Sequence, residues 1–234
     1  MWEEDLELRY RTPHGMSCLY LPRCAFPRSG RDAWRKKKQI EAMLTLLCSR
    51  LRPGDTVVDC GCGRGTLTTA LAVSSPSCDV LGFDIKEFKT WTELERYVES
   101  VGLDNLEFEV NDLHEAAKHG LPNDPDVVVG LHLCGTLTDR LLELAVDSDA
   151  HLVLVVPCCY GRASPRVIVE ELGVDEGIER VRKLLKKAEG PVEYQLEVCR
   201  MRGKFLEEHG YQVHVGVAFP EEVSGRRAFL MGIT

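Results

Sequence analysis

Short apolar segments separated by helical patterns constrain the fold of this chain more than any other feature. Their side chains are apolar on both faces, which is typical of strands buried between helices in a parallel sheet. The clearest of the helical patterns between them is TLTDRLLELA (136–145). The apolar segments are TVVDC (56–60), VLGFD (80–84), LEFEV (106–110), DVVVGLHL (126–133) and HLVLVV (151–156). This alternation predicts an α/β protein with a mostly parallel sheet.

The two ends of the chain predict elements of a different kind. LELRY and SCLYL flank the turn residues TPHG, which favours a small N-terminal hairpin. A helix is expected over Ile40–Leu51, because apolar residues recur there at helical spacing and RPGD follows. After a helix over Val198–Glu208, YQVHVGVAF and RRAFLMGIT predict an antiparallel pair that closes the sheet. We expect a hairpin and basic arm over residues 1–34 and one α/β domain over residues 35–234.

Composition and motif spacing argue against several classes of protein. The start, MWEEDLELRY, lacks the apolar segment of a secretory signal, and no run approaches the roughly 18 apolar residues of a membrane span. We therefore expect a cytoplasmic protein in a reducing compartment, where structural disulfides among its ten cysteines are rare. No C-x-x-C pair occurs, so a zinc finger is not predicted.

A glycine-rich turn follows the first buried strand. TVVDC runs into GCGRGTLTTALA, with glycines at positions 61, 63 and 65 before a helical pattern. Such glycines let the backbone turn tightly and approach a ligand, with helix N–H groups directed at it. The spacing is not the dinucleotide fingerprint, which would require glycine at Thr66.

Acidic residues lie at the ends of the same group of strands. Asp84 ends the second strand about 20 residues after the glycines, where a carboxylate can accept hydrogen bonds from both ribose hydroxyls. Asp112 follows the third strand, placed to reach an adenine amino group. Asp59 precedes the glycines and can hold the loop or face a ligand ammonium.

VVDCGCGRG, GFDIK and VNDL, in this order, resemble the core of the class I S-adenosylmethionine-dependent methyltransferases. The resemblance covers residues 35–234 and implies a Rossmann-like, seven-stranded, mostly parallel sheet with an antiparallel last strand and helices on both faces. It also implies methyltransferase activity with S-adenosyl-L-methionine as the cofactor. The cofactor-binding residues that it implies are Asp59, Gly61, Cys62, Gly63, Gly65, Asp84, Ile85, Asp112 and Leu113.

The fourth and fifth strand ends carry a second pair of motifs, GLHLCG (130–135) and VVPCCYG (155–161). Together with WRKKKQIEAM (34–43), they resemble a narrower branch that contains eukaryotic tRNA ribose 2′-O-methyltransferases and related methyltransferase-like proteins. The resemblance implies that the substrate enters above these strand ends. The candidate catalytic residues are His132, Cys134, Cys158, Cys159 and Tyr160.

Three hypotheses remain open for the chemistry at these strand ends. Paired cysteines could act covalently on a pyrimidine ring, as in RNA 5-methylcytosine enzymes, although the motif matches only in part. A metal could be held by His132 and the three cysteines, which supply the ligand types without a recognised spacing. We favour ribose methylation, with His132 as a base for the hydroxyl and Cys158, Cys159 and Tyr160 shaping the substrate floor.

A basic segment precedes the α/β domain. Residues 23–38 contain seven basic residues and one acidic residue, although the whole chain has a formal net charge of −8. Such a segment can steer a polyanion or can be a solvated face. We expect RNA (tRNA or rRNA) as the substrate, with phosphates bound by Arg23, Arg28, Arg31 and Lys36–Lys38. The alternatives are a methyltransferase for a protein or small molecule, and a cofactor-binding scaffold without catalysis.

Overall fold

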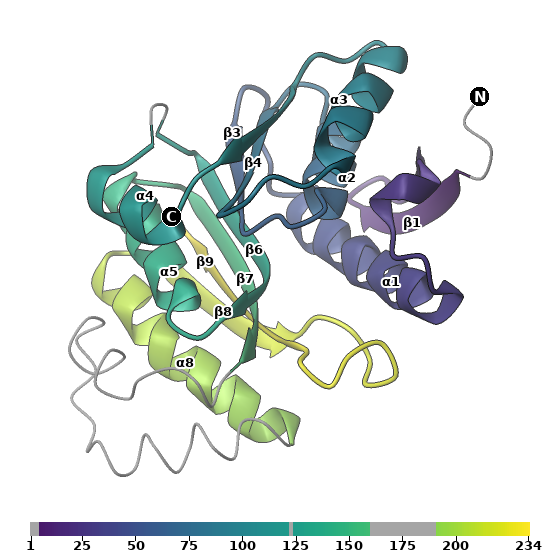
Figure 1. Ribbon diagram of the computed structural model, residues 1–234. Helices are drawn as coiled ribbons and strands as arrows, with labels where there is room; N and C mark the ends of the chain where they lie inside the picture. Colours follow the sequence, from purple (N-terminus) through teal and green to yellow (C-terminus); the bar gives the residue numbers. More distant parts are fainter. Residues whose placement is uncertain (1–4, 122–123, 160–190) are drawn as a thin grey trace. The chain divides into compact units, whose positions relative to one another are not determined.

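The computed structural model of the chain describes residues 5–121, 124–159 and 191–234. Backbone contacts divide the chain into two compact units, residues 1–112 and 113–234. Each unit alternates strands and helices (Figure 1). Both therefore follow the α/β pattern that the apolar segments predict.

The first unit contains the hairpin and the first three strands of the large sheet. Its elements are β1 (Leu6–Thr12), β2 (Gly15–Leu21), the 3₁₀ turn η1 (Arg23–Ala25), α1 (Gly30–Leu47), β3 (Thr56–Cys60), α2 (Thr66–Ser74), β4 (Asp79–Asp84), α3 (Thr90–Ser100) and β5 (Leu106–Val110). β4 pairs in parallel with both β3 and β5. β1 and β2 form the predicted antiparallel hairpin.

Helix α1 differs from the prediction at both ends. It begins at Gly30, well before Ile40, because Ser29 caps it: the Ser29 hydroxyl accepts the Asp32 N–H at 3.4 Å. It ends at Leu47, whose carbonyl accepts the N–H of Arg50 at 2.8 Å in a tighter turn. The predicted domain boundary after residue 34 therefore falls inside this helix.

The side chains of α1 hold the hairpin. The N–H groups of Arg9 and Arg11 on β1 donate to Glu41 Oε1 at 3.0 Å and to Thr45 Oγ1 at 3.1 Å. An isolated two-stranded hairpin is marginally stable in water, and these bonds also cover donors on its outer edge. The hairpin is thus part of the first unit rather than a separate arm.

The second unit contains the remaining four strands. Its elements are α4 (Leu113–His119), β6 (Val127–Cys134), α5 (Leu137–Asp147), β7 (Leu152–Cys159), α8 (Val192–Glu208), β8 (Gln212–Val217) and β9 (Ala228–Ile233). β6 and β7 are parallel, whereas β9 runs antiparallel to both β7 and β8. In Figure 1, α5 and α8 lie side by side against these strands.

The large sheet has seven strands in the order β5-β4-β3-β6-β7-β9-β8. Its first five strands in sequence are those predicted from the apolar segments, and its last two form the predicted antiparallel pair. The last strand, β9, is inserted between β7 and the edge strand β8. The predicted Rossmann-like fold with an antiparallel last strand is confirmed.

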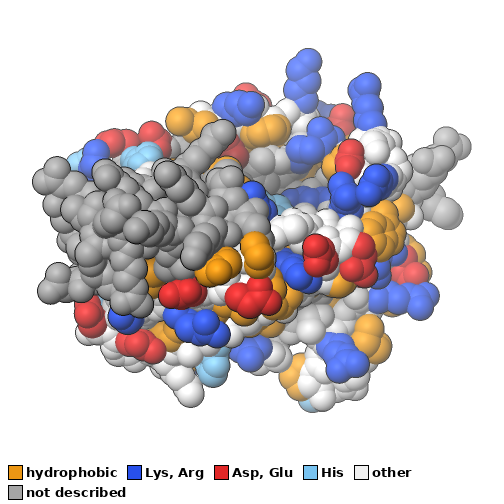
Figure 2. Space-filling view, turned by 90° about the horizontal axis from the view of Figure 1, so that it is seen from below, with side chains coloured by type: hydrophobic (Ala, Val, Ile, Leu, Met, Phe, Trp, Pro, Cys, Tyr) orange, Lys and Arg blue, Asp and Glu red, His pale blue; other side chains and the backbone are white. Residues whose placement is uncertain are grey.

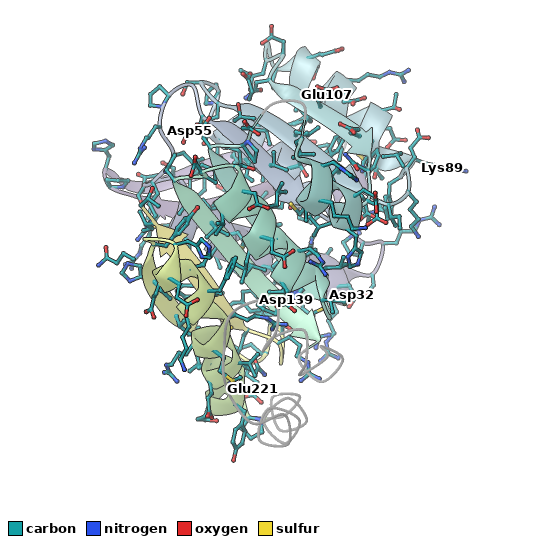
Figure 3. The ribbon with its side chains drawn as sticks, turned by 90° about the vertical axis from the view of Figure 1, so that its left-hand side faces the viewer. Asp32, Asp55, Lys89, Glu107, Asp139 and Glu221 are labelled. Atoms are coloured by element: carbon teal, nitrogen blue, oxygen red, sulfur yellow. The ribbon has the colours of Figure 1, made fainter. Side chains whose placement is uncertain are left out.

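A buried ion pair fixes α8 to the beginning of α5. Asp139, labelled in Figure 3, accepts a hydrogen bond from Arg202 Nε at 2.6 Å, and neither side chain is exposed. Arg202 also donates to the carbonyl of Gly135 in the GLHLCG motif, at 3.5 Å. A buried charge requires such partners. The sequence gives no sign of this pair.

In the part of the chain that the structure describes, no helix has the length and apolar character needed to cross a bilayer.

Candidate functional site

The loop after β3 makes the tight turn predicted from its glycines. Gly61, Gly63 and Gly65 have φ angles of 67°, 56° and 83°, in the left-handed region that disfavours other residues. A Cβ on Gly65 would lie 2.5 Å from the ring of Phe108, whereas a Cβ on Gly63 would meet nothing within 4 Å. Gly65 is therefore needed for packing, and Gly63 borders open space where a ligand can approach the backbone.

Two residues of α3 hold this loop, and sequence reasoning missed both. Trp91 Nε1 donates to the carbonyl of Gly63 at 2.7 Å, and Thr90 Oγ1 donates to the carbonyl of Arg64 at 2.9 Å. The indole of Trp91 stacks on Phe108, with ring centroids 5.2 Å apart and planes 7° apart. Their only sequence signal is that they open the helix that follows the Asp84 strand.

Asp84 lies at the end of β4, as predicted, and contacts the loop directly. Its Oδ2 accepts the N–H of Gly63 at 3.0 Å. None of the described residues donates to its other oxygen, so Oδ1 can accept hydrogen bonds from a ligand. The next residue, Ile85, is 68% exposed and offers an apolar surface beside the carboxylate. This pair suits a ribose with an attached base.

Asp59 is buried beneath the loop at the end of β3. The Thr68 hydroxyl donates to Asp59 Oδ2 at 2.8 Å. Burial raises the pKa of Asp59 to about 6, although the Thr68 hydrogen bond and the positive charge of Lys36 act in the opposite direction. Above about pH 6 the carboxylate is charged, which is compatible with either predicted role, holding the loop or attracting a ligand ammonium.

Lys36 reaches the same region from α1, which sequence reasoning did not anticipate. Burial lowers the pKa of its ammonium, and attraction to the Asp59 carboxylate offsets this only in part. The residue makes no hydrogen bond or salt bridge with any residue that the structure describes. The ammonium of Lys36, one of the residues predicted to contact RNA phosphates, lies near Asp59. A cation without a fixed partner beside the loop can bind an anionic group of a ligand.

The other predicted cofactor residues differ in burial and in the compact unit to which they belong. Burial raises the pKa of the Cys62 thiol, so it stays neutral and serves the loop through its backbone. Asp112 is half-buried just after β5, next to Asn111, whose N–H donates to the carbonyl of Asp84 at 3.0 Å. Leu113 begins α4 in the second unit and is buried there, at 5% exposure.

The first-unit residues fit S-adenosylmethionine. Gly63 leaves room for the backbone to approach the ligand, and Asp84 has an available oxygen for ribose hydroxyls. Ile85 offers an apolar surface to an adenine, while Asp59 and Lys36 carry opposite charges suited to the ammonium and carboxylate of a methionine. The predicted cluster is therefore chemically consistent with the cofactor.

The pairing of β6 and β7 is irregular at their carboxyl ends, where Cys134 and Cys158 come into contact. The register shifts between Leu131 and Leu133 and again between Leu133 and Cys134, so that His132 in β6 and Cys158 in β7 have no ladder partner. His132 has a φ of 69°, which is rare for residues other than glycine. Such bulges re-aim side chains and are frequent next to active sites.

The thiols of Cys134 and Cys158 and the backbone carbonyl of His132 form one cluster. The sulfur atoms of Cys134 and Cys158 are 2.8 Å apart. The Cys158 thiol also donates to the carbonyl of His132 at 3.1 Å, and the Cys134 thiol lies 3.9 Å from the same oxygen. Cys134 is exposed and Cys158 is half-buried. The sequence predicted these residues as neighbours, but not the bulges that join them.

The loop between β8 and β9 completes this cluster with residues that sequence reasoning missed. Phe219 meets the His132 ring edge-on, with centroids 6.1 Å apart. Arg226 Nε donates to the carbonyl of Cys158 at 3.0 Å. Gln195, fully buried on α8, donates to Gly225 at 2.7 Å and accepts the N–H of Arg227 at 3.1 Å. These contacts link residues far apart in sequence, which no local motif reveals.

Two predicted catalytic residues are described only in part or not at all. The backbone of Cys159 pairs with Cys134 in the sheet, and Tyr160 lies outside the described residues. Among the described side chains, no group of three or more His, Cys, Asp or Glu could hold a metal ion.

The basic residues of segment 23–38 differ in their contacts: some bind other parts of the protein and others are exposed. Arg23 donates to the carbonyls of Pro27 at 2.6 Å and Arg28 at 2.9 Å, so it holds the turn before α1. Lys38 pairs with Glu41 at 2.7 Å. Arg28 and Arg31 are exposed. On the face shown in Figure 2, Lys and Arg side chains are interspersed with Asp and Glu rather than forming a purely basic surface.

A family model described as a methyltransferase domain matches residues 35–166. The chain is 34% identical to the glutathione S-transferase C-terminal domain-containing protein homolog of Drosophila pseudoobscura pseudoobscura over 131 residues, which cover 56% of this chain and 21% of that protein. It is 27% identical to the corresponding protein of Bos taurus over 234 residues, which cover 91% of this chain and 36% of that protein. The chain thus spans only about a fifth to a third of these relatives.

Two solved structures share the fold at low sequence identity. The methyltransferase domain of bacterial CtHen1-CN aligns with a TM-score of 0.53 and 14% identity, covering 86% of this chain and 100% of that domain. A chain of the fibrillarin/Nop5p complex aligns with a TM-score of 0.50 and 15% identity, covering 86% of this chain and 84% of the other. Likeness at this level supports the fold alone.

Proposed function

We propose that this chain, which belongs to the methyltransferase-domain family and is an S-adenosylmethionine-dependent methyltransferase, acts on RNA. The cofactor, when bound, supplies an electrophilic methyl group on a sulfonium. Membership of the family does not specify the substrate, so the RNA substrate is the new element here. It is supported chiefly by one surface of α1.

That surface combines an exposed aromatic ring with basic side chains. Arg31, Trp34, Arg35 and Lys38 follow helical spacing and share one face of α1. Trp34 is 43% exposed, and Arg31 is exposed beside it. Single-stranded nucleic acids are bound by such combinations, because bases stack on aromatic rings while basic groups follow the phosphates. We call these four residues the α1 face.

We propose roles for the first-unit residues that are compatible with their contacts. Asp84 binds the cofactor ribose and holds the Gly63 N–H with its other oxygen. Asp59 faces the methionine ammonium, and Lys36 binds the methionine carboxylate. Trp91 and Thr90 keep the loop backbone in place for these contacts.

We propose roles for the second-unit residues from their position in the fold. In open parallel sheets, ligands bind at the carboxyl ends of the strands, where β6 and β7 place His132, Cys134 and Cys158. His132 is the candidate base for a ribose hydroxyl, with its ring positioned by Phe219. Cys134 and Cys158 line the floor on which the substrate lies.

The substrate class is tested by tritium transfer from labelled S-adenosylmethionine into fractionated cell extract. We expect label in the RNA fraction, and mass spectrometry of digested RNA then identifies the methylated nucleoside. Label confined to protein or to small molecules would contradict the RNA proposal and favour the corresponding alternative. Cofactor binding without transfer into any fraction would favour a scaffold.

A further inference from the structure

The contact between Cys134 and Cys158 has a consequence apart from methyl transfer. Both thiols are reduced in the structure, and their sulfur atoms lie 2.8 Å apart. A disulfide bond is about 2.05 Å long, so the sulfurs need to approach by roughly 0.8 Å to form one. The thiols are thus already close to bonding position.

The backbone also permits a bond between these two residues. Cys134 is the register partner of Cys159, the residue next to Cys158. Adjacent strands lie about 4.8 Å apart and one residue adds about 3.3 Å along a strand, which places the Cα atoms of Cys134 and Cys158 about 6 Å apart. Disulfides span about 4.4–6.8 Å between Cα atoms. In a regular ladder the diagonal neighbours would face opposite sides, but the two bulges bring these thiols together.

We propose that Cys134 and Cys158 form a reversible disulfide, which makes the ends of β6 and β7 a site of thiol oxidation by peroxides. The exposed Cys134 thiolate attacks the peroxide O–O bond, giving a sulfenic acid and one water. The Cys158 thiol then attacks that sulfur, forms the S–S bond and releases a second water. The two thiols together lose two electrons and two protons, and the peroxide is reduced to two waters. A dithiol reductant reverses the change by thiol–disulfide exchange.

The test treats the 234-residue chain with hydrogen peroxide, blocks remaining thiols and maps disulfides by mass spectrometry of peptides. We expect a Cys134–Cys158 link, two fewer titratable thiols than the ten of the reduced chain, and full return with dithiothreitol. Cys134→Ser and Cys158→Ser should each abolish the link. Because Cys158 and Cys159 are adjacent, Cys159→Ser identifies the partner and should keep the link.

Cys18→Ser is the matched control, since Cys18 is also exposed but lies on β2. This variant should form the same link at the same rate as the wild-type chain. Circular dichroism of every variant shows that it is folded. Overoxidation of Cys134 without a link, a Cys158–Cys159 link, a link that needs Cys159 or a disulfide between two chains would each overturn the proposal.

Discussion

Individual side chains around the glycine loop divide into those that hold the backbone and those that can face a ligand. Trp91 belongs to the first group, because its indole N–H is used on the carbonyl of Gly63. Lys36 belongs to the second, and Asp84 serves both through its two oxygens. Sequence reasoning could place Asp84 from its position at a strand end. It could not place Lys36, whose direction depends on how α1 packs.

The buried carboxylate of Asp59 makes stability depend on pH. Because burial raises its pKa from 3.8 to about 6, the folded chain keeps a proton that the unfolded chain releases. Its contribution to the free energy of unfolding therefore falls as pH rises from about 4 to 6, by about 2–3 kcal/mol in all. Asp59→Asn keeps an oxygen for Thr68 and removes the titration. In urea unfolding from pH 4.5 to 6.5, the variant should gain stability relative to the wild type, and a constant difference would contradict this origin.

Lys36 offers a direct test of its proposed contact with the cofactor. Lys36→Met keeps the apolar stem and removes the ammonium. A hydrogen bond to a charged group contributes about 1.5–3 kcal/mol, so affinity for S-adenosylmethionine should fall roughly 10- to 150-fold in calorimetric titration. Lys37→Met, the neighbouring change on α1, is the control and should bind as the wild type does. Equal affinities for both variants would remove Lys36 from the site.

At the scale of elements, the sequence predicted the strands, whose apolar runs are local features of the chain. The apolar runs predicted β3, β5 and the centres of the other parallel strands. Burial on both faces explains the signal of β3 and β6. The edge strand β5 has no buried residue, and its sequence alternates apolar and acidic side chains. The early start of α1 was missed, although Ser29 and Asp32 have capping spacing. The bulges in β6 and β7, and the loop that brings Phe219 and Arg226 to them, depend on long-range pairing and leave no comparable signal.

Breaking the ion pair between α5 and α8 should destabilise the protein strongly, and removing the second charge as well should restore part of the stability. Arg202→Met leaves the Asp139 carboxylate buried without its partner, so the free energy of unfolding should fall by about 3–5 kcal/mol. Adding Asp139→Leu removes the remaining charge and should restore part of that loss. Urea unfolding of both variants measures the difference. If the double variant is no more stable than the single one, the unpaired charge is not the cause.

At the scale of the whole molecule, the net negative charge disfavours the proposed RNA substrate. The chain has a formal net charge of −8, so overall electrostatics would repel RNA. The proposal therefore depends on a local surface, the α1 face, with its exposed Trp34 and Arg31. The fold follows from the sequence pattern, but substrate class depends on a few surface side chains and is harder to predict.

Salt dependence of RNA binding tests the α1 face. For single-stranded RNA, the logarithm of affinity should fall by about 0.7 per log unit of salt for each phosphate contact. Arg31→Glu should flatten this slope, and Trp34→Ala should weaken binding while leaving the slope unchanged. Arg11→Glu reverses an exposed charge on β1 and is the control. A salt-independent affinity, or equal effects of Arg31→Glu and Arg11→Glu, would favour a protein or small-molecule substrate.

Calorimetric titration with S-adenosylmethionine tests the assignment of the cofactor site most directly. The wild-type chain should bind the cofactor, and Asp84→Ala should lose roughly 10- to 150-fold in affinity, since it removes charged hydrogen bonds of about 1.5–3 kcal/mol. Asp79→Ala, at the opposite and exposed end of β4, should bind as the wild type does. No binding by the wild-type chain, or an unchanged affinity for Asp84→Ala, would contradict the site described for the first unit.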